Sequence, residues 1–241
     1  MMRVARRIAV ALATLGALAG RGVAQTDAAS ERVPPAPTAR VRPAGDAVPF
    51  RVGERLDYDV KFGPLTVGRA SMLVDAMDTV RGVDAWHTVF TVKGGTFFYQ
   101  VDDRLESWFD PDGLSALRFR ERLREGGHAR DHQFEIFPEQ TRYSEDGRPP
   151  EPSVEAPLDE GSFLYFVRTI PLEVGHEYEF NRYFRPDRNP VRLLVLRRER
   201  ITVPAGTFEA IVVRPIIKTR GIFSENGKAE ICDASLIMSP S

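Results

Sequence analysis

Apolar and polar residues alternate from Phe50 onward, and this period of two constrains the fold more than any other feature of the chain. Residues 56–62 alternate, a turn at Gly63-Pro64 follows, and residues 70–76 alternate again. Successive side chains of a strand point to opposite faces of a sheet, so this pattern is typical of strands with one buried face. Two adjacent antiparallel strands explain the two runs.

The same alternation continues along most of the chain and is interrupted by turns rich in glycine, proline and aspartate. We expect further strands at residues 86–92, 101–109, 116–123, 130–137, 177–184, 191–201 and 208–215. Many strands with short connections predict an all-β, mainly antiparallel fold, in which a meandering sheet curls into a half-barrel or open barrel.

One segment departs from the period of two. Between Pro157 and Pro171, apolar residues recur at spacings of three and four, which predicts a short helix from Ser162 to Ile170. Asp159 or Ser162 is suited to cap its start. We expect this helix to close one end of the curled sheet or to pack on its concave face.

The N-terminal segment, residues 1–24, has the composition of a cleaved secretory signal. Arginines precede an apolar run over residues 8–19 that is too short to span a bilayer, and small residues surround Ala24. We therefore predict cleavage after Ala24 and a periplasmic protein, the alternative being the cell surface or the extracellular space. No cysteine follows the run, so we expect no lipid anchor, and we expect no transmembrane segment after cleavage.

Residues 25–49 are rich in alanine and proline and contain no aromatic residue, which predicts a disordered linker. A proline-rich docking motif is the alternative. The β-rich domain is expected at residues 50–231. The remaining residues, 232–241, break the strand pattern and form an anomalous tail.

The charge and the cysteine content of the chain limit the classes of partner and the means of stabilisation that we expect. Four of the 33 basic residues lie in segment 1–24, which carries no acid, so the remainder has a net charge of about −5. This balance argues against a nucleic-acid partner, which requires a basic surface. Cys232 is the one cysteine, so no intramolecular disulfide can form and apolar burial must stabilise the core.

Five short blocks of sequence carry a family resemblance. They are FRVGERLDYDV at residues 50–60, GPLTVGRA at 63–70, SFLYFVR at 162–168, PLEVG at 171–175 and ERITVPAGTF at 199–208. In this order and spacing they resemble an exported bacterial family known as domain of unknown function 3108, over residues 50–231. The resemblance implies a β-rich periplasmic or surface domain with no assigned reaction, and it transfers no catalytic residue.

The C-terminal end departs from that family. Where its members continue with a turn and a final strand, this chain passes into residues 232–241, so we expect a truncated end. The strand at 227–231 would then have an unpaired edge, which favours association. An exposed Cys232 would allow an intermolecular disulfide.

Four arginines at alternate positions predict a row on one face of one strand: Arg118, Arg120, Arg122 and Arg124. A solvated outer face explains the row, and a site for an anionic partner such as a lipid headgroup or an acidic glycan is the alternative. Three aromatic residues after Gly94-Gly95 line an apolar ligand mouth or pack at a sheet corner: Phe97, Phe98 and Tyr99.

No motif for catalysis, a cofactor or a metal emerges. His128 and His132 would share one face of a helix as metal ligands, but Gly126-Gly127 and the alternation that follows favour a hairpin. The histidines at 87, 128, 132 and 176 lack a nucleophile motif. We therefore predict no catalytic residue, no cofactor and no metal.

Together these features favour a non-catalytic envelope protein whose curved sheet binds a lipid-like or other amphipathic molecule. The first alternative is a structural or interaction module that pairs an open sheet edge with an envelope protein partner. The second alternative is an uncharacterised hydrolase.

Overall fold

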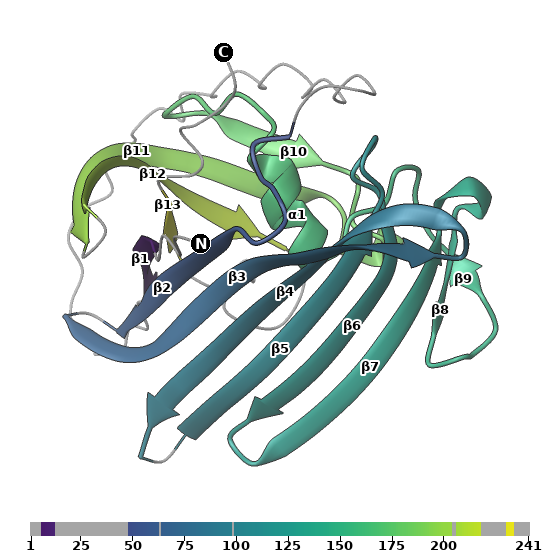
Figure 1. Ribbon diagram of the computed structural model, residues 1–241, viewed down its shortest axis with the longest axis horizontal. Coiled ribbons are helices and arrows are strands. Elements are labelled where there is room, and N and C mark those ends of the chain that lie inside the picture. Colours follow the sequence, from purple (N-terminus) through teal and green to yellow (C-terminus); the bar gives the residue numbers. More distant parts are fainter. Residues whose placement is uncertain are drawn as a thin grey trace, which may run out of the picture.

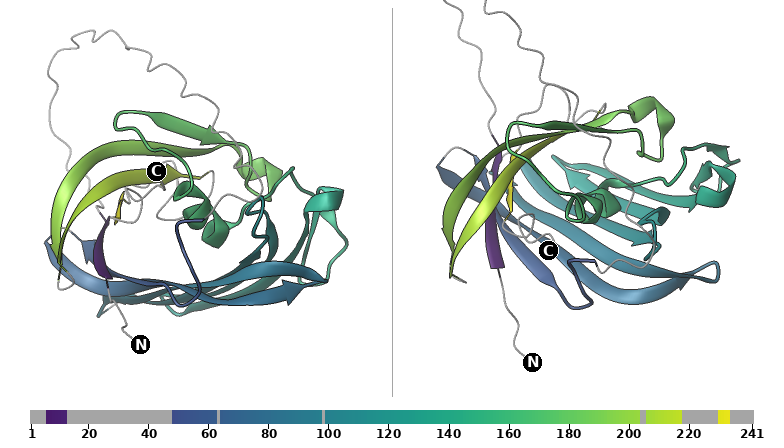
Figure 2. Two further views of the ribbon diagram at one scale, coloured as in Figure 1. Left: turned by 45° about the horizontal axis from the view of Figure 1, so that its top comes forward. Right: turned by 90° about the horizontal axis from the view of Figure 1, so that it is seen from above.

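The computed structural model describes residues 6–12, 48–62, 64–97, 99–203, 206–217 and 230–233 of the 241-residue chain. These residues form one 13-stranded sheet in the order β10-β11-β12-β13-β1-β2-β3-β4-β5-β6-β7-β8-β9. Neighbouring strands run antiparallel except β1 and β2, which are parallel. The sheet curls so that β11 and β12 lie across from β2 to β7, but it does not close into a barrel (Figures 1 and 2).

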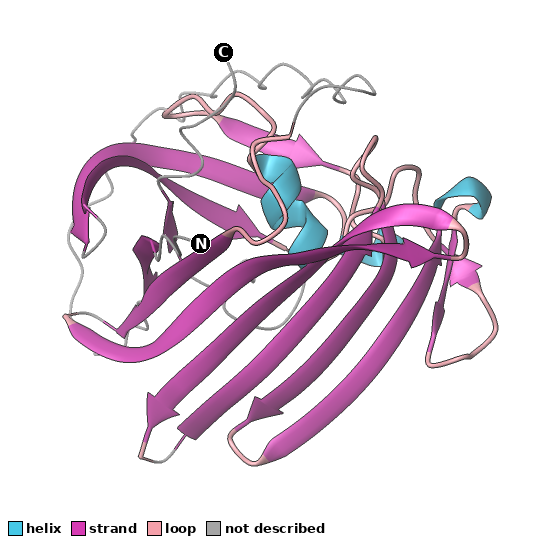
Figure 3. Ribbon diagram, in the orientation of Figure 1, coloured by secondary structure: helices cyan, strands magenta, loops and turns pink. Residues whose placement is uncertain are grey.

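The strands are β1 (Arg6–Leu12), β2 (Arg55–Phe62), β3 (Leu65–Val80), β4 (Val83–Thr96), β5 (Tyr99–Phe109), β6 (Ala116–Glu125), β7 (His128–Phe137), β8 (Arg142–Glu145), β9 (Glu151–Pro152), β10 (Glu177–Phe180), β11 (Val191–Val203), β12 (Gly206–Ile216) and β13 (Glu230–Asp233). The helices of the described residues are α1 (Glu160–Val167) and the 3-10 turns η1 (Pro138–Gln140) and η2 (Pro186–Arg188). Figure 3 shows how small the helical part is beside the sheet. None of the described helices is long and apolar enough to cross a membrane.

The predicted fold class is confirmed: the sheet is mainly antiparallel, curled and open, and it carries one short α-helix. Every strand expected from the alternation is present. The strand expected at residues 177–184 ends at Phe180, because residues 181–190 form a turn that contains η2. In this turn the side chain of Asn189 accepts the backbone N–H of Tyr183 at 2.9 Å.

Helix α1 begins two residues before the predicted Ser162 and ends three residues before Ile170. Asp159 and Ser162 cap it together: Asp159 accepts the backbone N–H groups of Gly161 and Ser162, and the Ser162 hydroxyl accepts the N–H of Asp159. This reciprocal capping box satisfies donors that a helix start leaves unpaired.

The cap also fixes α1 to the sheet. Ser107 in β5 donates its hydroxyl to Asp159 Oδ2 at 2.7 Å. Gly161 lies so close to β5 that an added Cβ would stand 2.7 Å from the Cβ of Ser107. A glycine is therefore required where the helix meets the strand.

The core lies between the inner face of the curled sheet and α1 (Figure 2). Phe50 joins the layers, because its ring makes edge contacts with Trp86 of β4, Phe109 of β5 and Tyr165 of α1. Buried Arg168 follows α1 and forms two hydrogen bonds with the Glu54 carboxylate, at 2.6 and 3.2 Å.

Both ends of the chain contribute strands at the seam between β12 and β2. Residues 6–12, within the predicted signal segment, form β1 and pair with β2 and β13. Residues 13–47, which include most of the predicted linker, lie outside the described residues. Cys232 and Asp233 belong to β13 rather than to an anomalous tail, since they pair with Val212 and Ile211 of β12.

The edge of β13 that was predicted to be unpaired is paired in the full chain, and for a chain without segment 1–24 the unpaired edge stays a prediction. Val10 of β1 pairs with Ile231 of β13, so the edge is covered in the full chain. Residues 218–229 and 234–241 lie outside the described parts of the chain.

Candidate functional site

A group of polar side chains interrupts the apolar inner face near the β7 and β8 end of the sheet. We call it the polar cluster, and its members are Glu121, His132, Glu145, Asp146, Glu160, Tyr183, Arg185 and Arg188. Glu121 of β6 stands opposite His132 of β7 in the same register. Since Phe119 and Phe134, two positions earlier and later, are buried in the core, both polar residues face inward.

Few positive charges and no hydrogen-bond donor compensate the burial of the Glu121 carboxylate within the described residues. Burial is the main cause that raises its pKa, and the nearby charge of Glu160 raises it further, while His132 and two arginines act in the opposite direction. No hydrogen bond to its carboxylate is formed within the described residues. These surroundings therefore favour either the neutral, protonated form of the Glu121 carboxyl group or a bound ligand that donates a hydrogen bond to it.

Glu160 opens α1 and joins the helix to the turn at residues 181–190. The Tyr183 hydroxyl donates to Glu160 Oε1 and accepts from Arg188 Nη1 at 3.0 Å. Burial raises the pKa of Glu160, and it raises the pKa of Tyr183 well above its ordinary value. The second oxygen of Glu160, Oε2, is buried and has no hydrogen-bond partner among the described residues.

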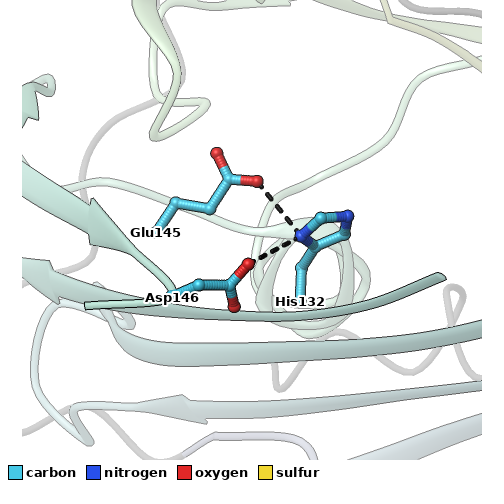
Figure 4. Close-up of side chains that lie close together, drawn as sticks. All are labelled: His132, Glu145 and Asp146. Atoms are coloured by element: carbon cyan, nitrogen blue, oxygen red, sulfur yellow. Dashed lines mark hydrogen bonds and ion pairs between the residues drawn. The ribbon is translucent and has the colours of Figure 1, made fainter. Parts of the chain in front are cut away.

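His132 lies beside two further carboxylates (Figure 4). Its Nδ1 is 2.9 Å from Asp146 Oδ2 and 3.2 Å from Glu145 Oε1. Asp146 also accepts the backbone N–H of Gln133 at 2.8 Å, and this bond, followed by that of His132, lowers the pKa of Asp146. These two hydrogen bonds join Asp146, the residue directly after β8, to β7.

One imidazole and two carboxylates are ligand types that divalent cations use, and their ligand atoms lie within 4.8 Å of one another. However, Glu145 also faces Arg185 at 3.6 Å and Arg148 at 3.7 Å. Because protein cations and an N–H group already compensate both acids, we interpret the three residues as an ion-paired part of the polar cluster.

The predicted hairpin at Gly126-Gly127 is confirmed, since β6 and β7 are paired from its turn onward. His128 is exposed at that turn, and His132 meets Glu145 and Asp146 instead of a second histidine. The polar partners of the other two predicted histidines are also acids. His87 lies between Asp75 and Glu106, and His176 lies 3.7 Å from Glu173.

The arginine row lies on the outer face of the sheet, opposite to the polar cluster. Its four members follow alternate positions of β6, as predicted. Arg118 binds Glu135 at 2.6 Å, and Arg124 binds both oxygens of Asp131 at 3.1 and 2.7 Å. For Arg120 and Arg122 no hydrogen bond or ion pair occurs within the described residues.

The surface around the row carries both signs of charge. A hollow of about 610 Å³ over β2, β3 and β4 is lined by Arg55, Arg69 and Lys93, but also by Asp57 and Asp59. This mixture suits a solvated outer face, and the anionic-ligand alternative stays a prediction.

Exposed apolar side chains gather at the end of the sheet away from α1. We call this group the apolar rim, and its members are Phe62, Leu65, Phe97 and Tyr99. They come from the tips of the β2–β3 and β4–β5 hairpins, which Figure 1 shows at one edge of the curled sheet. Phe97 is 91% exposed, so packing of this residue at a sheet corner is wrong, whereas Tyr99 is 50% exposed and half of its surface is covered.

Tyr99 of the rim lies against the neighbouring turn between β6 and β7. The ring of Tyr99 covers Gly126, where an added Cβ would lie 2.5 Å from Tyr99 Cε2. Phe98, the third aromatic residue predicted for the mouth, lies outside the described residues.

Sequence reasoning named His132 and two residues of the rim, Phe97 and Tyr99, but missed the other rim residues and the rest of the polar cluster. Glu121, Glu160 and Tyr183 come from a strand, a helix and a turn that are distant in sequence. The signal available was an acid at an inward position of an otherwise apolar strand face, which Glu121 provides.

Comparison of the chain with known proteins gives a match to one protein family. A family model described as a protein of unknown function (DUF3108) matches residues 57–232. No curated protein and no solved structure matches the chain. The match runs from β2 to β13 and covers both the polar cluster and the apolar rim.

Proposed function

The chain belongs to the DUF3108 family, and from this premise we propose that it is a non-catalytic, exported envelope protein that binds an amphipathic molecule on the inner face of its curled sheet. The proposed location is the periplasm, and the composition of segment 1–24 supports it. The ligand would place its apolar part near the rim and its polar end at the polar cluster.

The observation that carries the proposal is the incomplete burial of the inner face. Helix α1 packs on β4 and β5 near Ser107, far from the hairpin tips. Toward the rim, inward apolar side chains are only partly buried: Val60, Phe90, Val92 and Leu105. An apolar surface left partly open inside a curved sheet suits a hydrocarbon chain.

The apolar rim extends this surface to the outside. Leu65 is 64% exposed and Phe97 is 91% exposed, which is unusual for large apolar side chains. A lipid-like molecule that enters along the inner face would contact the rim first. In this proposal the rim is the apolar mouth, which is one of the two alternatives that the sequence left open.

The polar cluster supplies the second requirement of an amphipathic ligand. Glu121 and the Oε2 atom of Glu160 have no hydrogen-bond donors among the described residues, and burial raises the pKa of both groups. A polar end group that donates hydrogen bonds or carries positive charge would satisfy them.

Two matched variants test the proposal. Val92 faces inward and its neighbour Lys93 faces outward, so Val92→Gln and Lys93→Gln place the same side chain on opposite faces of β4. Protein purified from a lipid-containing host is analysed by native mass spectrometry and by titration with a fluorescent long-chain alkylamine. We expect Val92→Gln to weaken binding about tenfold and Lys93→Gln to leave it unchanged.

The proposal fails if the unmodified protein retains no amphiphile and binds none in the titration. Equal loss of binding in the two variants would also contradict it, because an outer-face residue would then matter as much as an inner one. Determination of the mature N-terminus tests export separately.

A further inference from the structure

The position of β1 in the sheet is unlike that of any other described strand. Every one of its residues pairs with β2, from Arg6 opposite Leu56 to Leu12 opposite Phe62. On its other side, Val10 and Ala11 pair with β13. Figure 2 shows β1 in purple between β2 and the yellow β13.

This strand lies outside the part of the chain that the family model matches. The family match begins at residue 57 in β2 and ends at residue 232 in β13, so both neighbours of β1 fall inside it and β1 falls outside. β1 also forms the one parallel pair among the described strands, and the long segment 13–54 separates it from β2 along the chain. A short hairpin therefore does not hold it in place.

Without β1, the edge of β2 would be free over nearly its full length. Every second residue of an edge strand offers its backbone N–H and C=O groups to a new neighbour. Removal of segment 1–24, as the sequence predicts, would expose this edge and the facing edge of β13 at the same time. The two edges would then flank a vacant strand position.

We propose that the position between β2 and β13 is a strand-acceptor site, filled by residues 6–12 in the full chain and by an extended segment of another polypeptide once those residues are removed. The incoming segment runs parallel to β2. The chain's own segment shows the chemistry that fits: it is seven residues long and continues with small or branched apolar residues after two arginines. The register places Arg7 opposite Asp57 and Leu12 opposite Phe62.

The test uses the full chain, in which the site is already filled. Val10 pairs on both sides, with Val60 and with Ile231, so Val10→Pro disrupts β1 most directly. Thr14→Pro lies beyond the paired segment and is the matched control. The probe is a synthetic peptide of residues 4–14, offered in trans and followed by fluorescence anisotropy.

We expect the peptide to bind the Val10→Pro chain and not the unmodified chain or the Thr14→Pro chain, whose own segment fills the site. A peptide carrying the same Val10→Pro change should bind the variant chain at least about tenfold more weakly, because it loses ladder hydrogen bonds. Near-ultraviolet circular dichroism of Trp86 and Trp108 monitors the fold of each chain.

Two results would overturn the proposal. The first is a folded Val10→Pro chain that binds neither peptide or binds both equally. The second is unfolding of that chain while Thr14→Pro stays folded, since a position that cannot be emptied cannot accept a partner. Neither result depends on amphiphile binding, so the proposed function is tested independently.

Discussion

The two ends of the inner face have the same alternating pattern and very different burial. At the end covered by α1, Val74 and Phe109 are fully buried, whereas at the rim Leu65 and Phe97 are 64% and 91% exposed. Both ends belong to long strands of one sheet. The difference teaches that an alternating pattern defines which face is apolar, while a second layer decides whether that face becomes core.

Neighbouring acids at the start of α1 differ in how their polar contacts are satisfied. Asp159 has three hydrogen bonds from Ser107, Gly161 and Ser162. The next residue, Glu160, keeps one buried oxygen without a hydrogen-bond partner, and Glu121 accepts no hydrogen bond, within the described residues. Asp159 therefore fixes the helix to the sheet, whereas Glu160 and Glu121 remain available to a donor, which is the contrast expected between a structural contact and a binding surface.

The largest expected effect is the loss of a large side chain at the covered end. Phe109→Ala removes a fully buried ring that contacts Phe50 and Tyr165. We expect a loss of about 4 kcal/mol in the free energy of unfolding, through lost burial and a cavity under α1. Urea denaturation followed by tryptophan fluorescence measures it, and a loss under about 1 kcal/mol would mean that α1 does not seal this end.

The next largest loss of stability is expected when the attachment of α1 to the sheet is weakened. Asp159→Ala removes the cap of α1 and the acceptor of the Ser107 hydroxyl, for which we expect a loss of about 3 kcal/mol. Asp187→Ala, at an exposed acid in the first turn of η2, is the control and should change stability by under about 0.5 kcal/mol. Similar losses for both variants would contradict the role of the cap.

Asp159 also gives the covered end a pH dependence. Burial raises its pKa from 3.8 to about 7, and the hydrogen bonds from Ser107 and the backbone only partly oppose this shift. The folded state therefore holds a proton that the unfolded state has released, so this group stabilises the fold most below pH 4 and loses that contribution as the pH rises toward 7. Relative to the unmodified protein, Asp159→Asn should become progressively more stable between pH 4 and pH 8. Parallel pH profiles of the two melting temperatures would contradict this assignment.

Sequence reasoning was strongest where a local pattern repeats. The long strands and the placement of the arginines on one face of β6 follow from the period of two, which needs no knowledge of the neighbours. It was weakest for β8 and β9, which are too short to show a period.

The polar cluster could not be predicted from the sequence, for a different reason. Its members come together only when α1 and the turn at residues 181–190 pack over β6 and β7. Phe97 was expected partly as core because aromatic residues usually are, but no described layer covers the hairpin tip.

The smallest expected effect on stability is at the open end, and it is the sharpest test of the comparison. Phe97→Ala makes the same change as Phe109→Ala at a side chain that is already 91% exposed. Little burial is lost, so we expect the free energy of unfolding to change by less than about 0.5 kcal/mol, whereas binding of a fluorescent long-chain alkylamine should weaken by about threefold. Denaturation and titration of the same preparations separate the two readouts. If Phe97→Ala destabilised the protein as much as Phe109→Ala, the rim would be part of the core, and unchanged binding would mean that the rim is not the mouth of the ligand site.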